Sequence, residues 1–328
     1  MVWIEFTVCV LIIFFAGRQV ARYGDIIAER TGLGRVWIGV ILIALITSLP
    51  ELFTGISAVT LVNAPDLAVG DLIGANSFNL FNMALLDIFN RNGSLLTNVS
   101  ITHRLTGWLS IAMILLVVIS IILSFYIHPM ALFEIGWYTP AILLLYLYSV
   151  KKISSAERNE PYTSEPQLYT AEAATRKIIL YFSIAAAFII GAGIWLAIIG
   201  SEISTVTGLG HSFVGSLFLA FTTTLPEITV SFTAIRIGAK DMAVANLIGS
   251  NLFNLTIIPI TDLFYRQSPL LDSVSLNHLV TAAAVILMTI IFIIGLKFHP
   301  KRYYRLSWWN LSLIMLFLIA VYFNFIRA

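Results

Sequence analysis

The sequence TSLPE at residues 47–51 lies inside an apolar stretch, 37–62, that is long enough to cross a membrane. Pro50 has no backbone N–H and clashes with the carbonyl four residues earlier, so a kinked or opened helix is predicted here. Glu51 follows directly, although an ionisable side chain is costly at the centre of a bilayer and is usually kept there for a function. Thr47 lies on the same helical face as Glu51. A carboxylate, a hydroxyl and freed carbonyls together indicate a cavity lined for a cation.

The composition places most of the chain inside a bilayer. Of 328 residues, 59% are hydrophobic and 11% are charged, and the mean hydropathy is +0.93. A soluble domain is roughly one quarter charged, whereas about 20 apolar residues cross the hydrocarbon layer. The single cysteine, Cys9, excludes an internal disulfide and a cysteine-based metal site, and the N-terminal MVWIEF shows no cleavable signal. We predict an all-α polytopic membrane protein, with no indication of a nucleic acid or an obligatory protein partner.

Polar residues, glycine and proline divide the chain into ten predicted transmembrane helices. The polar segment 151–175 separates them into a first five-helix repeat, 1–150, and a second, 176–328, and is predicted to be a flexible linker. With the N-terminus outside, the inner loops hold all of the 19 Lys and Arg residues except Arg266 and Arg327. The positive-inside rule therefore predicts both termini outside and a cytoplasmic linker. The predicted spans are 3–22, 36–62, 67–89, 105–126, 130–150, 176–199, 211–235, 242–264, 276–297 and 307–325.

The motif recurs once, in the second half. GVILIALITSLPEL at 39–52 matches GSLFLAFTTTLPEI at 215–228, and AVGDLIGANSFNL at 68–80 matches AVANLIGSNLFNL at 243–255. Each half has an odd number of spans, so the second copy must be inverted relative to the first. Inverted repeats with broken helices at corresponding positions indicate a secondary transporter whose site lies near the midplane.

Glu51 and its counterpart Glu227 both fall roughly 23 Å along their spans, near mid-depth, at 1.5 Å of rise per residue. Two nearby carboxylates repel each other unless a cation or a proton lies between them. Two unrelated neutral glutamates are the alternative, which the matched prolines and hydroxyls disfavour. Thr47 and Thr223 precede the glutamates by four residues, and each either bonds its own backbone or contributes to the site. Oxygen donors suit Na⁺ or Ca²⁺, and the lack of histidine or thiolate disfavours zinc or copper.

The second matched stretch supplies amides. Each copy has two asparagines three residues apart, and one of each pair is predicted to face the site while the other joins helices. Asp71 aligns with Asn246, and Pro259 has no proline counterpart, which predicts an asymmetric kink. Asp87 and Asp262, at span ends, are predicted to cap helices or to be solvated at the membrane interface rather than to bind ions. The five histidines, also at span ends, receive no role.

These repeats resemble the alpha repeats of the sodium/calcium exchanger branch of the calcium/cation antiporter superfamily, of the prokaryotic type. The resemblance implies that Glu51 and Glu227 are the main Ca²⁺ ligands and are shared with Na⁺. It also implies a prokaryotic plasma (inner) membrane location and no cofactor other than the transported ions. Further ligands implied are Thr47, Thr223, Thr224, Ser250, Asn79, Asn254 and the backbone carbonyls of Ala44 and Ala220.

The chain departs from the family pattern at three positions. Ala75 stands where the pattern has a serine, Asn254 where many members have an aspartate, and Ile46 where a glycine is usual. These differences affect the number of Na⁺ sites and any K⁺ co-transport.

The resulting hypothesis is a Na⁺/Ca²⁺ antiporter in which the first and sixth spans move against a fixed core. Proton/cation exchange through the same two glutamates is the nearest alternative. An intramembrane protease needs a matched aspartate pair, which the sequence around Asp71 does not offer. A passive channel remains a further alternative, although channels seldom need two inverted broken-helix sites.

Overall fold

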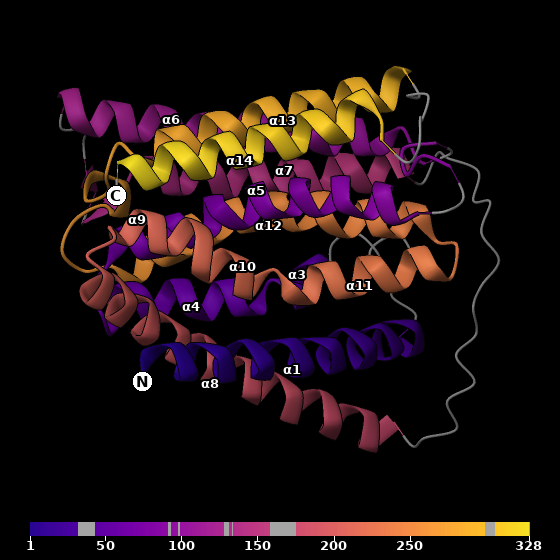
Figure 1. Ribbon diagram of the computed structural model, residues 1–328, viewed down its shortest axis with the longest axis horizontal. Coiled ribbons are helices and arrows are strands. Elements are labelled where there is room, and N and C mark those ends of the chain that lie inside the picture. Colours follow the sequence, from indigo (N-terminus) through magenta and orange to yellow (C-terminus); the bar gives the residue numbers. More distant parts are fainter. Residues whose placement is uncertain are drawn as a thin grey trace.

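The computed structural model describes residues 1–31, 43–90, 93–97, 99–127, 131–132, 134–157, 175–298 and 306–327. The described part is a bundle of helices (Figure 1), with one short antiparallel strand pair. The elements of the first half are α1 (Val2–Thr31), α3 (Ile43–Thr47), α4 (Leu49–Thr60), α5 (Pro65–Phe89), α6 (Thr102–Ile127), β1 (Ala131–Leu132), β2 (Ile135–Gly136) and α7 (Tyr138–Glu157). Those of the second half are α8 (Thr175–Thr207), α9 (His211–Val214), the π-helix Gly215–Leu219, α10 (Ala220–Thr223), α11 (Leu225–Arg236), α12 (Lys240–Phe264), the 3₁₀ turn Leu270–Asp272, α13 (His278–Phe298) and α14 (Trp308–Ile326).

The predicted all-α membrane fold is confirmed. Among the described residues, seven helices are long and apolar enough to span a membrane, and the bent pair His211–Thr223 with Leu225–Arg236 makes an eighth. The other two predicted spans correspond to α7 and to α3 with α4, and residues 36–42 of the latter lie outside the described part. α12 continues through Pro259 as one helix.

The predicted span 130–150 is placed too early. Residues 131–136 contain the pair β1–β2, and α7 begins only at Tyr138. The backbone N–H of Gly136 and the hydroxyls of Tyr138 and Thr139 all donate to the carboxylate of Asp262, which fixes this start. α7 then continues through Glu157 into the predicted linker, and residues 158–174 lie outside the described part.

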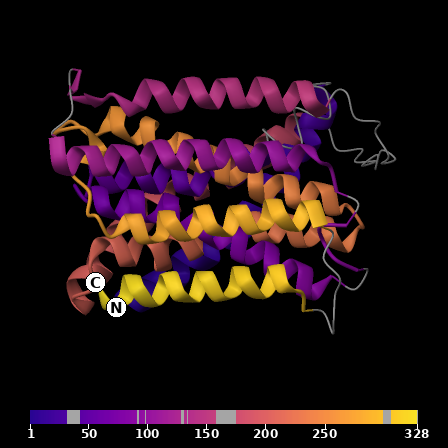
Figure 2. The same ribbon diagram turned by 90° about the horizontal axis from the view of Figure 1, so that it is seen from above.

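Two broken helices cross the bundle in opposite directions (Figure 1). α3 and α4 run from the end at which α7 finishes towards the end that holds both termini, whereas α9, α10 and α11 run the other way. Seen from above (Figure 2), the N- and C-terminal ends again lie together. α5 and α12 are the most enclosed of the described candidate spans. Of an 18-residue apolar stretch in each, 78% of the residues in α5 and 94% of those in α12 are buried. This opposite course matches the inversion that the sequence repeat predicts.

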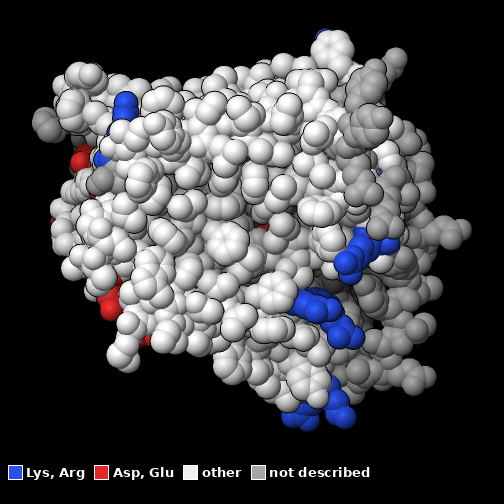
Figure 3. Space-filling model, in the orientation of Figure 1, with Lys and Arg blue, Asp and Glu red and all other residues white. Residues whose placement is uncertain are grey.

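Charged side chains are unequally divided between the two ends of the bundle. In Figure 3 most of the visible Lys and Arg lie where α7 ends and α8 begins, and most of the visible Asp and Glu lie at the other end. The long flanks between the two ends are almost free of visible charge, as a surface facing lipid requires. That the basic end is cytoplasmic stays a prediction.

Polar side chains join the two halves at related positions. Asn76 Nδ2 donates to the backbone carbonyl of Asn251 at 3.1 Å, and Asn251 Nδ2 donates to the carbonyl of Asn76 at 3.2 Å. These two asparagines therefore join α5 to α12, which is the role predicted for one of each pair.

Two histidine–aspartate pairs also connect the halves, one near the start of each central helix. His103 Nε2 lies 2.9 Å from Asp241 Oδ1, and His278 Nε2 lies 2.8 Å from Asp66 Oδ1. Each pair joins a residue of one half to a residue of the other. Sequence analysis assigned these histidines no role, and the structure gives them this structural one.

Asp262 is the most heavily bonded of the predicted caps. Its carboxylate accepts hydrogen bonds from the backbone of Gly136 and Leu270 and from the hydroxyls of Tyr138 and Thr139. Its counterpart Asp87 accepts from the backbone N–H of Leu95 and from Asn310 Nδ2. Both aspartates hold helix ends, so the capping interpretation is confirmed.

We expect Asp262→Asn to lower the stability of the protein by about 2 kcal/mol, because an amide nitrogen would face N–H and O–H donors. The thermal midpoint of the purified protein in detergent measures this loss. Glu202→Gln, which removes an exposed carboxylate from α8, serves as the control and is expected to leave the midpoint unchanged. An equal midpoint for the two variants would contradict a structural role for Asp262.

Candidate functional site

The matched motifs TSLPE (47–51) and TTLPE (223–227) interrupt their helices at the same position. Ser48 separates α3 from α4 with φ −87° and ψ 15°, and Thr224 separates α10 from α11 with φ −78° and ψ 1°. The following proline enters the first turn of the new helix, where its missing N–H is tolerated. In the second half the two segments differ in direction by 42°, and a π-helix, a feature frequent at functional sites, precedes the break at Gly215–Leu219.

Glu51 and Glu227 lie one turn beyond these breaks and are 0% exposed. Their carboxylates are close enough to repel each other. Ser48 Oγ crosses between the repeats and donates to Glu227 Oε1 at 3.0 Å. Among the described residues, Glu227 Oε2 and both carboxylate oxygens of Glu51 have no hydrogen-bond partner. Buried carboxylate oxygens without donors are costly, and a bound cation would remove this cost.

The threonine hydroxyls surround the two glutamates but are already engaged. Thr47 Oγ1 donates to the carbonyl of Ala44 at 3.2 Å and lies 3.4 Å from Ser250 Oγ. Thr224 Oγ1 donates to the carbonyl of Ala220 at 2.7 Å. Thr47 thus makes the backbone bond that was the alternative to ion binding, whereas Thr223 Oγ1 lies 3.4 Å from the carbonyl of Ala220 and 3.0 Å from Asp71 Oδ1. Each hydroxyl still has lone pairs with which to contact a cation.

The two backbone carbonyls that the resemblance implies as ligands are not the ones that the breaks release. The carbonyl of Ala44 accepts the N–H of Ser48 at 3.0 Å, and that of Ala220 accepts the N–H of Thr224 at 3.2 Å. Pro50 instead removes the donor that the carbonyl of Ile46 would receive in a continuous helix. The carbonyls of Ala44 and Ala220 thus each accept a backbone N–H and a threonine hydroxyl, so neither is released by the break.

Asn79 and Asn254 present free amides. Both side chains are 0% exposed, and within the described part of the chain neither amide oxygen nor amide nitrogen has a hydrogen-bond partner. Asn76 and Asn251, three residues earlier, use their amide nitrogens to join the helices. The hydrogen bonds therefore agree with the prediction that one asparagine of each pair joins helices. The other asparagine has an unpartnered buried amide oxygen, which suits a hard cation.

Asp71 is the acidic residue that sequence reasoning left out of the site. It is 0% exposed, and its Oδ1 accepts the hydroxyl of Thr223 at 3.0 Å. Its carboxylate also repels that of Glu51. An ionisable residue within an apolar span indicates a function by itself, and the sequence shows Asp71 near the start of the predicted span 67–89. Among the described residues, no three of the His, Cys, Asp and Glu side chains converge closely enough to hold one metal ion.

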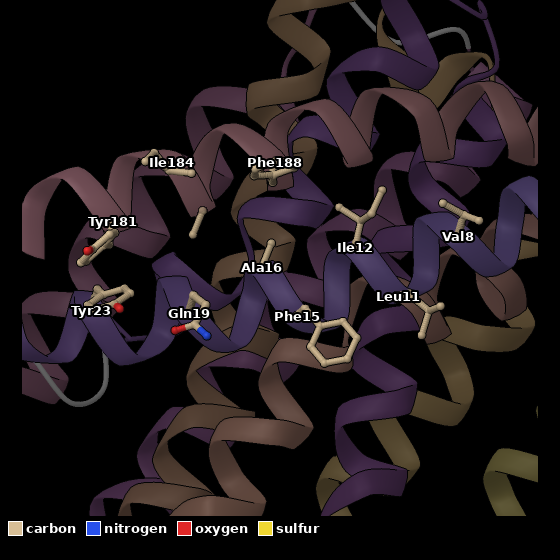
Figure 4. Close-up of a pocket in the computed structure, with 11 residues that line it drawn as sticks. Val8, Leu11, Ile12, Phe15, Ala16, Gln19, Tyr23, Tyr181, Ile184 and Phe188 are labelled. Atoms are coloured by element: carbon tan, nitrogen blue, oxygen red, sulfur yellow. The ribbon is translucent and has the colours of Figure 1, made fainter.

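A lateral groove of about 540 Å³ lies between α1 and α8 (Figure 4), apart from the carboxylates. It is lined mainly by apolar and aromatic side chains, among them Ile12, Phe15 and Phe188, with Gln19 as the polar exception. No acidic or basic residue lines it, so this groove is not the ion site.

The fold is shared with solved structures of the sodium-calcium exchanger NCX_Mj. One, soaked with Na⁺ and Sr²⁺, matches with a TM-score of 0.61 and 18% identity, and covers 98% of this chain and 99% of that chain. Another, soaked with Na⁺ and zero Ca²⁺, gives a TM-score of 0.63 at the same identity. At this identity the likeness establishes the fold and nothing further.

Relatives are found among bacterial and animal proteins. Inner membrane protein YrbG of Escherichia coli (strain K12) is 22% identical over 253 residues, which cover 76% of this chain and 75% of YrbG. Sodium/potassium/calcium exchanger 2 of Mus musculus is 32% identical over 98 residues, which cover 28% of this chain but only 14% of that exchanger.

The family model described as sodium/calcium exchanger protein matches residues 1–150 and 177–326, which is nearly the whole chain. This match rejects the intramembrane protease alternative. The chain belongs to the sodium/calcium exchanger family, and it is an integral membrane cation antiporter rather than an enzyme.

Proposed function

We propose that this protein exchanges Na⁺ for Ca²⁺ at a site between the two broken helices, by alternating access. The observation that carries the proposal is the pair Glu51 and Glu227, which are fully buried and mutually repelling. Three of their four carboxylate oxygens have no hydrogen-bond partner among the described residues. Such an arrangement is stable only when positive charge occupies it.

The chemistry of the surrounding donors supports a hard cation. Ca²⁺ takes six to eight oxygen ligands at flexible geometry, and carboxylate, amide and hydroxyl oxygens are available here. Asn79 and Asn254 contribute unpartnered amides, and the hydroxyls of Thr47 and Thr223 lie on either side. Because two carboxylates cannot satisfy Ca²⁺ and a full set of Na⁺ ions at once, one ion displaces the other. NCX_Mj, whose fold this chain shares, is a sodium-calcium exchanger.

α1 and α8 are the elements suited to move. They pack along each other at the side of the bundle. Of an 18-residue apolar stretch in each, only 28% of the residues in α1 and 39% of those in α8 are buried. Cys9 Sγ of α1 contacts the carbonyl of Ala192 of α8 at 3.3 Å, so that the two helices are joined to each other. We propose that this pair slides over α4 and α11 and opens the site to either side in turn.

The test is a vesicle assay. Purified protein is reconstituted, the vesicles are loaded with Na⁺ and diluted into Na⁺-free medium, and uptake of radiolabelled Ca²⁺ is followed. We expect uptake that depends on the outward Na⁺ gradient and is absent in protein-free vesicles. No gradient-dependent uptake would reject Na⁺/Ca²⁺ exchange, and a simultaneous current far above transporter turnover would indicate a channel.

Proton/cation exchange is the second candidate, and the same buried glutamates favour it because a proton also neutralises an unpaired carboxylate. Replacing the Na⁺ gradient by a pH gradient in the same vesicles separates the two mechanisms. Uptake driven by the pH gradient alone would assign the counter-ion role to H⁺. Addition of K⁺ to the medium tests co-transport in the same assay. The prokaryotic plasma membrane and the cytoplasmic position of residues 151–175 are further parts of this proposal.

A further inference from the structure

The two halves differ in charge at one buried position beside the site. Asn246 of α12 donates its amide to the backbone carbonyl of Glu227 at 3.1 Å and to Ser231 Oγ at 3.0 Å. Its counterpart in α5 is Asp71, and the counterpart of Ser231 is Gly55. An ionised carboxylate donates no hydrogen bond, so Asp71 is unable to perform the bonding of Asn246.

Close backbone packing holds this part of α5 against α9 and the π-helix that precede α10. A Cβ atom on Gly70 would lie 2.9 Å from the carbonyl oxygen of Ser212, and one on Gly74 would lie 2.6 Å from the backbone of Ser216. Asp71 lies between these two glycines on α5. The contact brings its Oδ1 to the hydroxyl of Thr223 at 3.0 Å.

Asp71 is a buried acidic residue that no basic side chain pairs with among the described residues. Its Oδ2 is buried and has no hydrogen-bond partner among the described residues. Within the same residues, the ion pairs are His103–Asp241 and His278–Asp66, both near helix starts. The Thr223 hydroxyl lies 3.0 Å from Asp71 Oδ1 and 3.4 Å from the carbonyl of Ala220, and neither oxygen of Glu51 has a hydrogen-bond partner among the described residues.

We propose that Asp71 and Glu51 together hold a Na⁺ ion, with the hydroxyl of Thr223 between the two carboxylates. This Na⁺ position lies next to the position that Ca²⁺ occupies between Glu51 and Glu227. This inference rests on the proposed exchange function and adds a residue and an ion position to it. Glu51 is shared between the two positions because both of its buried oxygens have no hydrogen-bond partner among the described residues, so that each can contact one ion. No three acidic groups of the described residues converge on one ion, which favours two adjacent positions over one.

Charge decides which ion fills the second position. Two divalent ions on either side of one carboxylate repel each other four times as strongly as two monovalent ions at the same distance. Two Na⁺ ions can therefore occupy the adjacent positions together, whereas one Ca²⁺ excludes a second. A third carboxylate consequently favours the Na⁺-loaded state more than the Ca²⁺-loaded state.

The test compares Asp71→Asn with the wild type. Asparagine is nearly isosteric and is the residue that the repeat itself places at position 246. In vesicles, we expect the Na⁺ concentration that half-inhibits Ca²⁺ uptake to rise about tenfold, as loss of a charged ligand predicts. The Ca²⁺ concentration for half-maximal uptake without external Na⁺ should change by less than about twofold. Thr223→Val, which removes the intervening hydroxyl, should change the Na⁺ dependence in the same direction.

A binding measurement separates this inference from the proposed function. A ligand that binds the folded state raises the thermal midpoint with its concentration. We expect NaCl, compared with choline chloride, to stabilise the wild type, and Asp71→Asn to need about ten times more Na⁺ for the same shift. Asp262→Asn is the control, since it removes a structural carboxylate and should keep the wild-type Na⁺ dependence. Wild-type vesicles that show no exchange would reject the function alone, because the thermal shift still reports Na⁺ binding.

Three outcomes would overturn the role of Asp71. Unchanged Na⁺ dependence in Asp71→Asn would show that the carboxylate holds no Na⁺. An equal loss of Ca²⁺ affinity would place Asp71 at the Ca²⁺ position instead. A wild type that Na⁺ does not stabilise would exclude a Na⁺ site of this kind.

Discussion

Glu51→Gln is expected to reduce Na⁺-driven Ca²⁺ uptake at least about a hundredfold. Removal of one partner from a desolvated charge contact costs about 2–5 kcal/mol, and each 1.4 kcal/mol is tenfold in affinity. A hundredfold reduction corresponds to about 2.8 kcal/mol, which lies within this range. Its two oxygens have no protein donor among the described residues, so the substitution removes an ion ligand without breaking a side-chain hydrogen bond of Glu51 to those residues.

The folded state of Glu51→Gln should be at least as stable as the wild type in the absence of Na⁺ and Ca²⁺, because the repulsion between buried carboxylates is relieved. Initial uptake rates in vesicles and thermal midpoints in ion-free detergent buffer measure the two effects separately. Glu202→Gln makes the same chemical change on the exposed face of α8 and should retain wild-type uptake. Full uptake by Glu51→Gln would reject the site.

Gly74→Ala is expected to destabilise the protein by about 3 kcal/mol and to abolish exchange. Its added methyl would lie 2.6 Å from the backbone of Ser216 and 2.9 Å from Ala220 Cβ. Overpacking of a filled interior costs typically 1–3 kcal/mol, and backbone atoms give way less readily than a flexible side chain. The shift that relieves the clash would move α5 away from α10 and separate Asp71 from Thr223.

Gly191→Ala is the matched control, since a Cβ there meets nothing within 4 Å. Alanine is favoured over glycine in a helix by up to about 1 kcal/mol, so this variant should be as stable as the wild type or slightly more so. Thermal midpoints and vesicle uptake of the two variants provide the comparison. Equal behaviour would show that the contact between α5 and the π-helix does not support the site.

The sequence predicted the elements of this fold because the hydrocarbon layer imposes a simple length rule on apolar helices. It also predicted a break at Pro50 and at its counterpart Pro226, since proline cannot continue a helix without losing a hydrogen bond, and the interruptions lie two residues earlier, at Ser48 and Thr224. The predicted start of α7 was wrong. Hydropathy carries no information on the hydrogen bonds that Gly136 and Tyr138 donate to Asp262, which is distant in sequence. Long-range hydrogen bonds of this kind are invisible to a local pattern.

The sequence by itself determined which residues are chemically suited to the site. Prolines, glutamates and asparagines recur at matched positions, and the cost of burying them in a membrane is a property of the residue types. Only the tertiary structure decided how each is used. Asn76 joins helices while Asn79 presents a free amide, and the carbonyl of Ala44 stays bonded to Ser48. Asp71 reaches Thr223 because glycines allow two backbones to touch, and such a contact depends on packing between segments that are far apart in the chain.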